Sequence, residues 1–92
     1  MTREEFCRRV QSVSDSLDRS PLEVIAGECS RTRYSAEVRE AYSPSSAWCY
    51  VVGEDEGTVC DNAWSVLIVR LCDNLDRARK ALTAARRFSD DA

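Results

Sequence analysis

The longest regularly patterned segment of the chain is residues 61–88, DNAWSVLIVRLCDNLDRARKALTAARRF. Its main apolar residues alternate four and three positions apart, which places them on one face of an α-helix. They are Trp64, Ile68, Leu71, Leu75, Ala78, Leu82 and Ala85. A helix of this length would extend about 42 Å, because an α-helix rises about 1.5 Å per residue. The segment therefore predicts one long C-terminal helix, with Asp61 as its N-cap.

The two halves of this predicted helix differ in character. The first half, from Trp64 to Cys72, is apolar almost all round, which predicts burial in the core. The second half carries a narrow stripe of small residues, Ala78, Ala81 and Ala85. Such a stripe allows close packing, either against a helix of the same chain or against a second chain. The sequence leaves both possibilities open.

The segments upstream predict further helices. Residues 2–5, TREE, match a capping box and predict a helix over residues 3–18. Residues 20–23, SPLE, are a second capping box with proline at the first helical position, and predict a short helix that ends near residue 28. After a polar turn, the apolar spacing predicts a third short helix over residues 34–42.

The middle of the chain allows two interpretations. Residues 47–52, AWCYVV, are aromatic and β-branched, which favours a strand. A glycine-flanked loop follows, so this strand could pair with residues 58–60 as a short hairpin. The competing interpretation is a helix that starts at Pro44 and is capped by Gly53. The hairpin is the favoured one.

The expected fold is therefore mainly α: a small bundle of three to four helices with the long C-terminal helix and a short β-hairpin at about residues 47–60. An α+β fold is the alternative. The chain has 92 residues, of which 43% are hydrophobic and 32% charged, and this composition is that of an ordinary globular domain. We expect a single domain over residues 1–88 and a frayed tail over residues 89–92.

The composition argues against catalysis. The sequence has no histidine, the usual general base at neutral pH, and only three glycines, so it lacks a glycine-rich phosphate loop. Its five cysteines are an odd number, and no two are spaced as C-x-x-C, the spacing typical of structural zinc sites. We expect neither an enzyme nor a metal site nor any other cofactor.

Charge and hydropathy restrict the partners and the location. The formal net charge is −3, which disfavours direct binding of nucleic acid. No apolar run is long enough to cross a membrane, and no apolar segment typical of a secretory signal follows the charged N-terminus. All but one of the 13 basic residues are arginine, which suggests a bacterial or phage gene. We therefore expect a cytoplasmic protein, in a bacterium or in the host of a phage.

Two clusters are the candidate partner-binding residues. One is an acidic loop with two aromatic residues nearby, and the other is the basic C-terminal stretch. The candidates are Glu54, Asp55, Glu56, Trp48, Tyr50, Arg79, Arg86 and Phe88. The ordinary alternatives are a solvated turn for the first cluster and pairing within the helix for the second.

By small size, acidity and lack of catalytic motifs, the chain resembles the small inhibitory proteins of phages and mobile elements, such as anti-CRISPRs, and bacterial immunity proteins. The resemblance implies a non-enzymatic inhibitor whose partner is a larger protein or a protein–nucleic acid complex. A homodimeric structural or adaptor protein, joined through the C-terminal helix, is the second hypothesis. A DNA-binding regulator resembling helix-turn-helix proteins, with Arg31 and Arg33 as contacts, is the third.

Overall fold

The fold combines three helices with an antiparallel sheet. The computed structural model describes residues 1–16, 21–73 and 75–90. Its elements are α1 (Arg3–Asp15), β1 (Leu22–Ser30), β2 (Arg33–Glu40), β3 (Ser43–Gly53), α2 (Glu56–Asp73) and α3 (Leu75–Asp90). The three strands form one sheet in the order β1–β2–β3. The protein is therefore α+β, and the expected mainly-α bundle is wrong.

The first helix begins where the capping box predicts. The hydroxyl of Thr2 accepts a hydrogen bond from the backbone N–H of Glu5 at 3.1 Å. Phe6, Val10 and Val13 form the buried face of α1. The helix ends at Asp15, and residues 17–18 of the predicted helix lie outside the described residues.

Strands β1 and β2 stand where two short helices were expected. Tyr34, Ala36 and Val38 are buried at every second position of β2, which is the period of a strand. The helical interpretation rested on the spacing of Tyr34, Val38, Ala41 and Tyr42. The four-residue spacing of Tyr34 and Val38 is also two strand repeats, and Ala41 and Tyr42 form the turn after β2. The polar turn predicted after residue 29 is confirmed, since it joins β1 to β2. The helix-turn-helix hypothesis requires two helices on either side of this turn, and the structure has strands there instead.

The predicted strand at residues 47–52 is confirmed within β3, but its partner is not the one expected. β3 pairs with β2, and residues 58–60 belong to α2. Asp55 caps α2, because its carboxylate accepts the backbone N–H of Thr58 at 2.9 Å. The helix therefore starts before the predicted N-cap Asp61. Gly53 permits this tight connection, since a Cβ there would lie 2.7 Å from Cγ2 of Val59.

The single long C-terminal helix is wrong, because the segment forms two helices, α2 and α3. Its first half lies in the core as predicted, with Leu67 and Leu71 fully buried. A continuous helix would carry its second half beyond the fold and leave the small-residue stripe in solvent. In the observed arrangement α3 packs on α1 and α2, and Ala81 and Ala85 are fully buried. These two alanines are thus used within the chain and are not a surface for a second copy.

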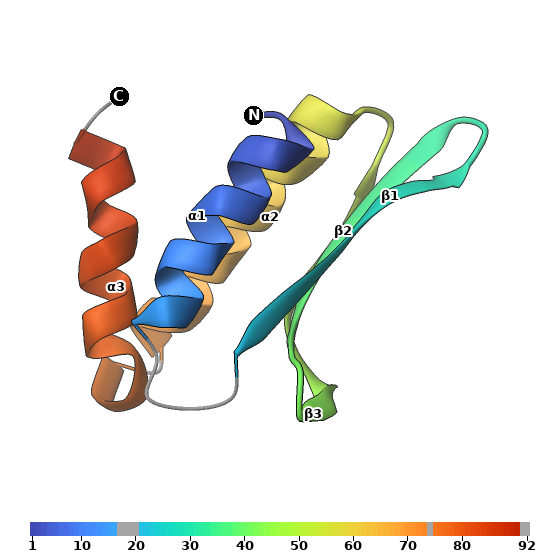
Figure 1. Cartoon of the computed structure of the whole chain (residues 1–92). Helices are drawn as coiled ribbons and strands as arrows, with labels where there is room; N and C mark the ends of the chain where they lie inside the picture. The colour runs from blue at the N-terminus through green and yellow to red at the C-terminus, as the bar shows by residue number, and fades with distance from the viewer. Residues whose placement is uncertain (17–20, 74, 91–92) are drawn as a thin grey trace.

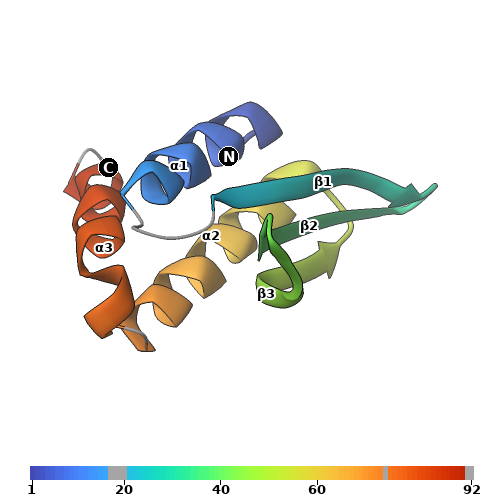
Figure 2. The same cartoon turned by 60° about the horizontal axis from the view of Figure 1, so that its bottom comes forward.

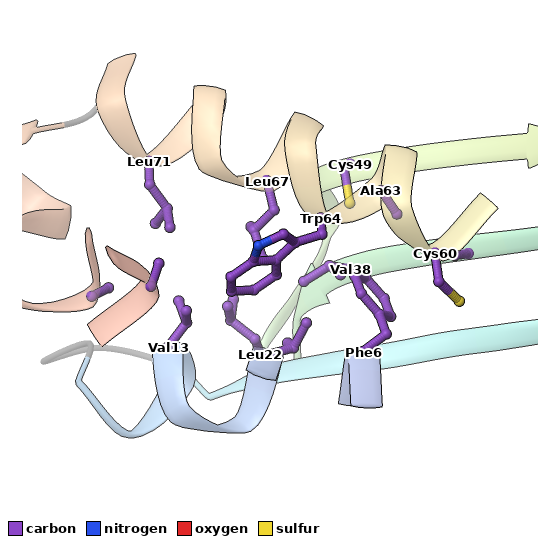
Figure 3. Packing of buried hydrophobic residues seen from close by; sticks show 14 of the residues in the cluster. Phe6, Val13, Leu22, Val38, Cys49, Cys60, Ala63, Trp64, Leu67 and Leu71 are labelled. Atoms are coloured by element: carbon purple, nitrogen blue, oxygen red, sulfur yellow. The ribbon is translucent and has the colours of Figure 1, made fainter. Parts of the chain in front are cut away.

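The elements form three layers (Figure 1). The sheet is one layer, α1 and α2 side by side are the second, and α3 packs on the side of this helix pair away from the sheet. Helices α1 and α2 begin at the same end, where the ammonium group of Met1 forms an ion pair with Asp61. Figure 3 shows how side chains such as Phe6, Val38 and Leu67 point toward one another between the helix pair and the sheet.

The expected single domain with a frayed tail stays a prediction. Residues 89–90 belong to α3, and residues 91–92 lie outside the described part of the chain.

Leu67→Ala is expected to lower the free energy of unfolding by about 2–5 kcal/mol, because it removes a fully buried side chain and leaves a cavity. Val69→Ala on the same helix is the matched control: Val69 is 59% exposed, so its loss should change stability by less than about 0.5 kcal/mol. Urea unfolding followed by circular dichroism measures both. Equal effects of the two substitutions would contradict the described core.

Candidate functional site

One face of the sheet is covered by no helix or strand of the described residues (Figures 1 and 2). Helices α1 and α2 pack on the opposite face, which carries the buried residues of β2. Since side chains alternate between the two faces of a sheet, the strand register identifies the residues of the uncovered face. We call this surface the outer face; it is formed by Glu23, Ile25, Gly27, Ser35, Glu37, Arg39, Ala47, Tyr50 and Val52.

The centre of the outer face is a row of three residues from three strands. Ile25 pairs with Glu37, and Glu37 pairs with Tyr50. Ile25 is 45% exposed and Tyr50 is 64% exposed, and Val52 beside Tyr50 is 37% exposed. At Gly27 a Cβ would meet no atom within 4 Å. The row is therefore open to contact from solvent over its whole width.

The charges of the outer face leave one carboxylate available. Arg39 and Glu23 form an ion pair across β1 and β2 at 2.9 Å. Among the described residues Glu37 takes part in no ion pair, although it lies between the side chains of Ile25 and Tyr50. The arrangement therefore presents a single acid flanked by an aliphatic and an aromatic side chain.

The acidic loop lies at one end of the sheet, between β3 and α2. Glu54, Asp55 and Glu56 are all exposed. The N–H of Thr58 holds the pKa of the Asp55 carboxyl below its ordinary value, because that bond favours the charged form. Asp55 is therefore engaged in capping α2, whereas no described residue forms an ion pair with Glu54.

The acidic loop faces basic residues of the same chain. A hollow of about 340 Å³ separates it from the turn between β1 and β2. The hollow is lined by Glu28, Ser30, Arg31, Thr32, Arg33, Tyr34, Glu54, Asp55 and Glu56. The predicted acidic surface is therefore of mixed charge where it faces this hollow.

The two aromatic residues predicted beside the acidic loop have different environments. Tyr50 lies on the outer face and is exposed. Trp48 falls at the irregularity where the register between β2 and β3 shifts, and it is half-buried against the core. Its indole N–H donates to the carboxylate of Glu40 at 3.4 Å. Of the two, only Tyr50 is positioned as a contact residue.

The candidates of the C-terminal stretch lie in the layer farthest from the sheet. Arg79 and Arg86 are exposed on α3. Phe88 is half-buried and meets Trp64 edge to face, with 5.8 Å between ring centroids. The guanidinium of Arg9 lies over both rings, 5.0 Å from the centroid of Phe88. Phe88 therefore joins α3 to α1 and α2, and the sequence-predicted residues do not form one site.

Basic residues of α3 also lie at the C-terminal end of α1. Arg79 and Arg87 line a hollow of about 440 Å³ together with Ser16, the residue that caps α1. The last turn of α1 has no basic residue of its own. Cations from α3 at this end complement the negative end of the helix dipole, which favours a structural role for them.

Two of the cysteines have a thiol whose pKa is raised by burial. Burial raises the pKa of the Cys49 thiol to about 11, and burial also raises the pKa of Cys60 above its ordinary value. A thiol acts as a nucleophile only as the thiolate, so these two cysteines are unreactive as nucleophiles at neutral pH. In the described part of the chain no group of three or more histidine, cysteine, aspartate or glutamate residues is placed to hold a metal ion.

Sequence reasoning missed the central residues of the outer face, Ile25, Glu37 and Val52. A signal was present: in residues 34–38 the apolar residues occupy every second position, so Ser35 and Glu37 fall on the opposite face. Which residues of β1 and β3 flank Glu37 depends on the register and cannot be read from one strand.

Comparison with known proteins identifies no relative: no protein family, curated protein or solved structure matches the chain. Among the described helices, none combines the length and the apolar character that a membrane span requires.

Alkaline pH is expected to destabilise the fold through Cys49. Its thiol has a pKa of about 11 in the folded chain and about 9 without the burial, so above pH 9 the unfolded state loses its proton first. This group leaves stability unchanged below pH 9. Between about pH 9 and 11 it lowers the free energy of unfolding by up to about 1.4 kcal/mol per pH unit.

Urea titrations at a series of pH values measure this loss. Cys49→Ala should show a shallower decline than the wild type, whereas Cys29→Ala, at an exposed position, should decline as the wild type does. Identical declines for Cys49→Ala and the wild type would contradict the assigned burial effect.

Proposed function

We propose that this protein is a non-enzymatic binding module that docks a larger protein on the outer face of its sheet. The observation that carries the proposal is the exposed central row, in which Ile25 and Tyr50 flank Glu37 with no covering element in the described chain. Exposed apolar side chains grouped on one face of a small protein mark interaction surfaces. Tyrosine is also among the residues that contribute most to binding energy in interfaces.

The chemistry of the row selects the kind of partner. Glu37 lies on β2 between an aliphatic side chain on β1 and an aromatic one on β3. An arginine or lysine of the partner could pair with the carboxylate and lie over the ring of Tyr50, an arrangement that a ring quadrupole favours. Apolar residues around that cation would cover Ile25 and Val52. The partner surface is therefore a basic side chain within an apolar patch.

The negative net charge of the protein also favours a basic partner. The chain carries a formal net charge of −3, and the acidic loop stands at one end of the sheet. A negative surface speeds the encounter with a basic partner, in a way that falls with ionic strength.

In the cell, we propose, this module acts in the cytoplasm as an inhibitor of a larger protein or of a protein–nucleic acid complex. Small size, acidity and the lack of a catalytic constellation are the features that support this role. They are shared with the inhibitory proteins of phages and mobile elements and with bacterial immunity proteins.

Site-specific photocrosslinking in the cells that naturally make the protein tests the docking surface. A photoreactive phenylalanine analogue in place of Tyr50 should give a discrete adduct with a heavier protein, and the same analogue in place of Arg86 on α3 should not. Adding Glu37→Arg to the Tyr50 probe should reduce the adduct about tenfold, because a favourable charge contact becomes a repulsive one. An adduct of equal yield from position 86, or one indifferent to Glu37→Arg, would rule out the outer face as the docking surface.

A further inference from the structure

Strand β3 has a free edge that lacks the usual protection. It pairs with β2 on one side, and on the other side no described residue forms a backbone hydrogen bond with it. Its 11 residues, SPSSAWCYVVG, include no charged side chain. Proteins normally blunt such an edge with charges, proline or a bulge, because the unpaired N–H and C=O groups accept another strand. The register shift near Trp48 interrupts the strand before Cys49, so Cys49–Gly53 has no such protection.

The flank of α2 next to this edge is also apolar. Helix α2 packs beneath β3 and runs in the opposite direction, since Val59 lies against Gly53 and Arg70, eleven residues later, lies near Cys49. Between these two contacts the helix exposes Val66, which lies four residues before Arg70 and therefore on the same flank. Helix α1 lies along the other flank of α2 (Figure 2), so this one borders the free edge.

Exposed apolar residues are concentrated around the edge. Six large hydrophobic side chains are exposed among the described residues. Three of them, Tyr50, Val52 and Val66, belong to β3 or to the flank of α2 beneath it. A single occupant that adds a strand to β3 and a helix beside α2 would cover this concentration.

We propose that this occupant is a second copy of the chain, whose β3 pairs with β3 in antiparallel orientation around a two-fold axis at Val51. The unguarded segment Cys49–Gly53 is centred on that residue, so the axis pairs the whole segment with itself. Tyr50 then lies opposite Val52 of the second copy, on the outer face. An aromatic side chain opposite a β-branched one is a favourable cross-strand pair. The two-fold axis repeats this pair, so Tyr50 and Val52 of each copy contact each other's flanks across the new strand pair and still face solvent on the outer face.

Charge complementarity favours a second copy over an unrelated strand. In this register Cys49 lies opposite Gly53 of the second copy, and the acidic loop of that copy follows directly. Arg70 lies near Cys49, so the arginine of each copy approaches Glu54 of the other. The strand pair itself buries no charge. Two such contacts, one at each end, fix the register and the antiparallel direction.

The dimer would carry a continuous sheet of six strands, with both outer faces on one side. The same docking surface that we propose for a partner would then be presented twice. Because Val66 and Arg70 lie outside the outer face, this inference and the proposed partner docking can be tested separately.

Sedimentation equilibrium of the full chain tests the inference. The wild type should sediment as a dimer, twice the chain mass of 10.4 kDa, and should dissociate as salt is raised. Arg70→Glu and Glu54→Arg should each raise the dimer dissociation constant at least about tenfold, and the combined double variant should restore it, because the charges are exchanged and not lost. Val66→Lys should also weaken the dimer, whereas Ile25→Lys, on the outer face but away from the edge, should not.

Circular dichroism verifies that each variant remains folded. The double variant separates the two explanations: restored dimerisation requires charge pairing between residues 54 and 70, whereas a structural loss at Arg70 would not be restored. A wild type that stays monomeric from micromolar to millimolar concentration would overturn the inference. So would a dimer that Ile25→Lys disrupts while Arg70→Glu leaves it intact, since that result places the contact on the outer face.

Discussion

The packing of the central strand against one pair of helices is the constraint on which the rest of the structure depends. Tyr34, Ala36 and Val38 alternate along β2 and are all buried beneath α1 and α2. Once these side chains are committed to one face, the register of β1 and β3 assigns every remaining strand residue to a face. Helix α3 packs on the side of this helix pair away from the sheet and forms the third layer.

The helical parts were predictable where a local signal and the tertiary packing agree. The hydroxyl of Thr2 caps α1 as predicted, although the carboxylate of Glu5 pairs with Arg8 and Arg9. Leu67 and Leu71 lie in the core, as the apolar character of residues 64–72 predicts. The strands were missed because the spacing of Tyr34 and Val38 fits both a helix and a strand. Strand pairing decides between them, and pairing is a property of residues distant in sequence. Local propensity is only a weak prior in such a case.

The start and the end of the long helical segment show a related limit. Asp61 and Asp55 are both acceptable N-caps, and the close contact of Val59 with Gly53 is compatible only with the earlier one. The division into α2 and α3 allows burial of apolar side chains that a single straight helix could not bury. Turning back buries Ala81 and Ala85 against the rest of the fold, whereas a straight helix would leave them in solvent.

The candidate site was predictable in its residue types more than in its geometry. Exposure of the acidic loop follows from its charge and its flanking glycines. By contrast, Trp48 and Tyr50 are two residues apart, which in a regular strand would place them on one face. The register shift between β2 and β3 separates them, so that Trp48 packs on the core and Tyr50 faces solvent.

The uncovered face and the unguarded edge have a common origin in the size of the chain. A chain of 92 residues can bury only about 60–65% of the surface that it exposes when unfolded. Here the buried apolar residues lie between the three helices and one face of the sheet. Helix α3 packs on α1 and α2, so the other face of the sheet has no cover among the described elements. Ile25, Tyr50 and Val52 consequently stay exposed although their types suit an interior. A sheet of alternating faces tolerates this only if the exposed face is polar or is covered by another chain. Glu37 and the Glu23–Arg39 pair make this face polar enough to be exposed to water, while the apolar residues beside them make it suitable for a partner.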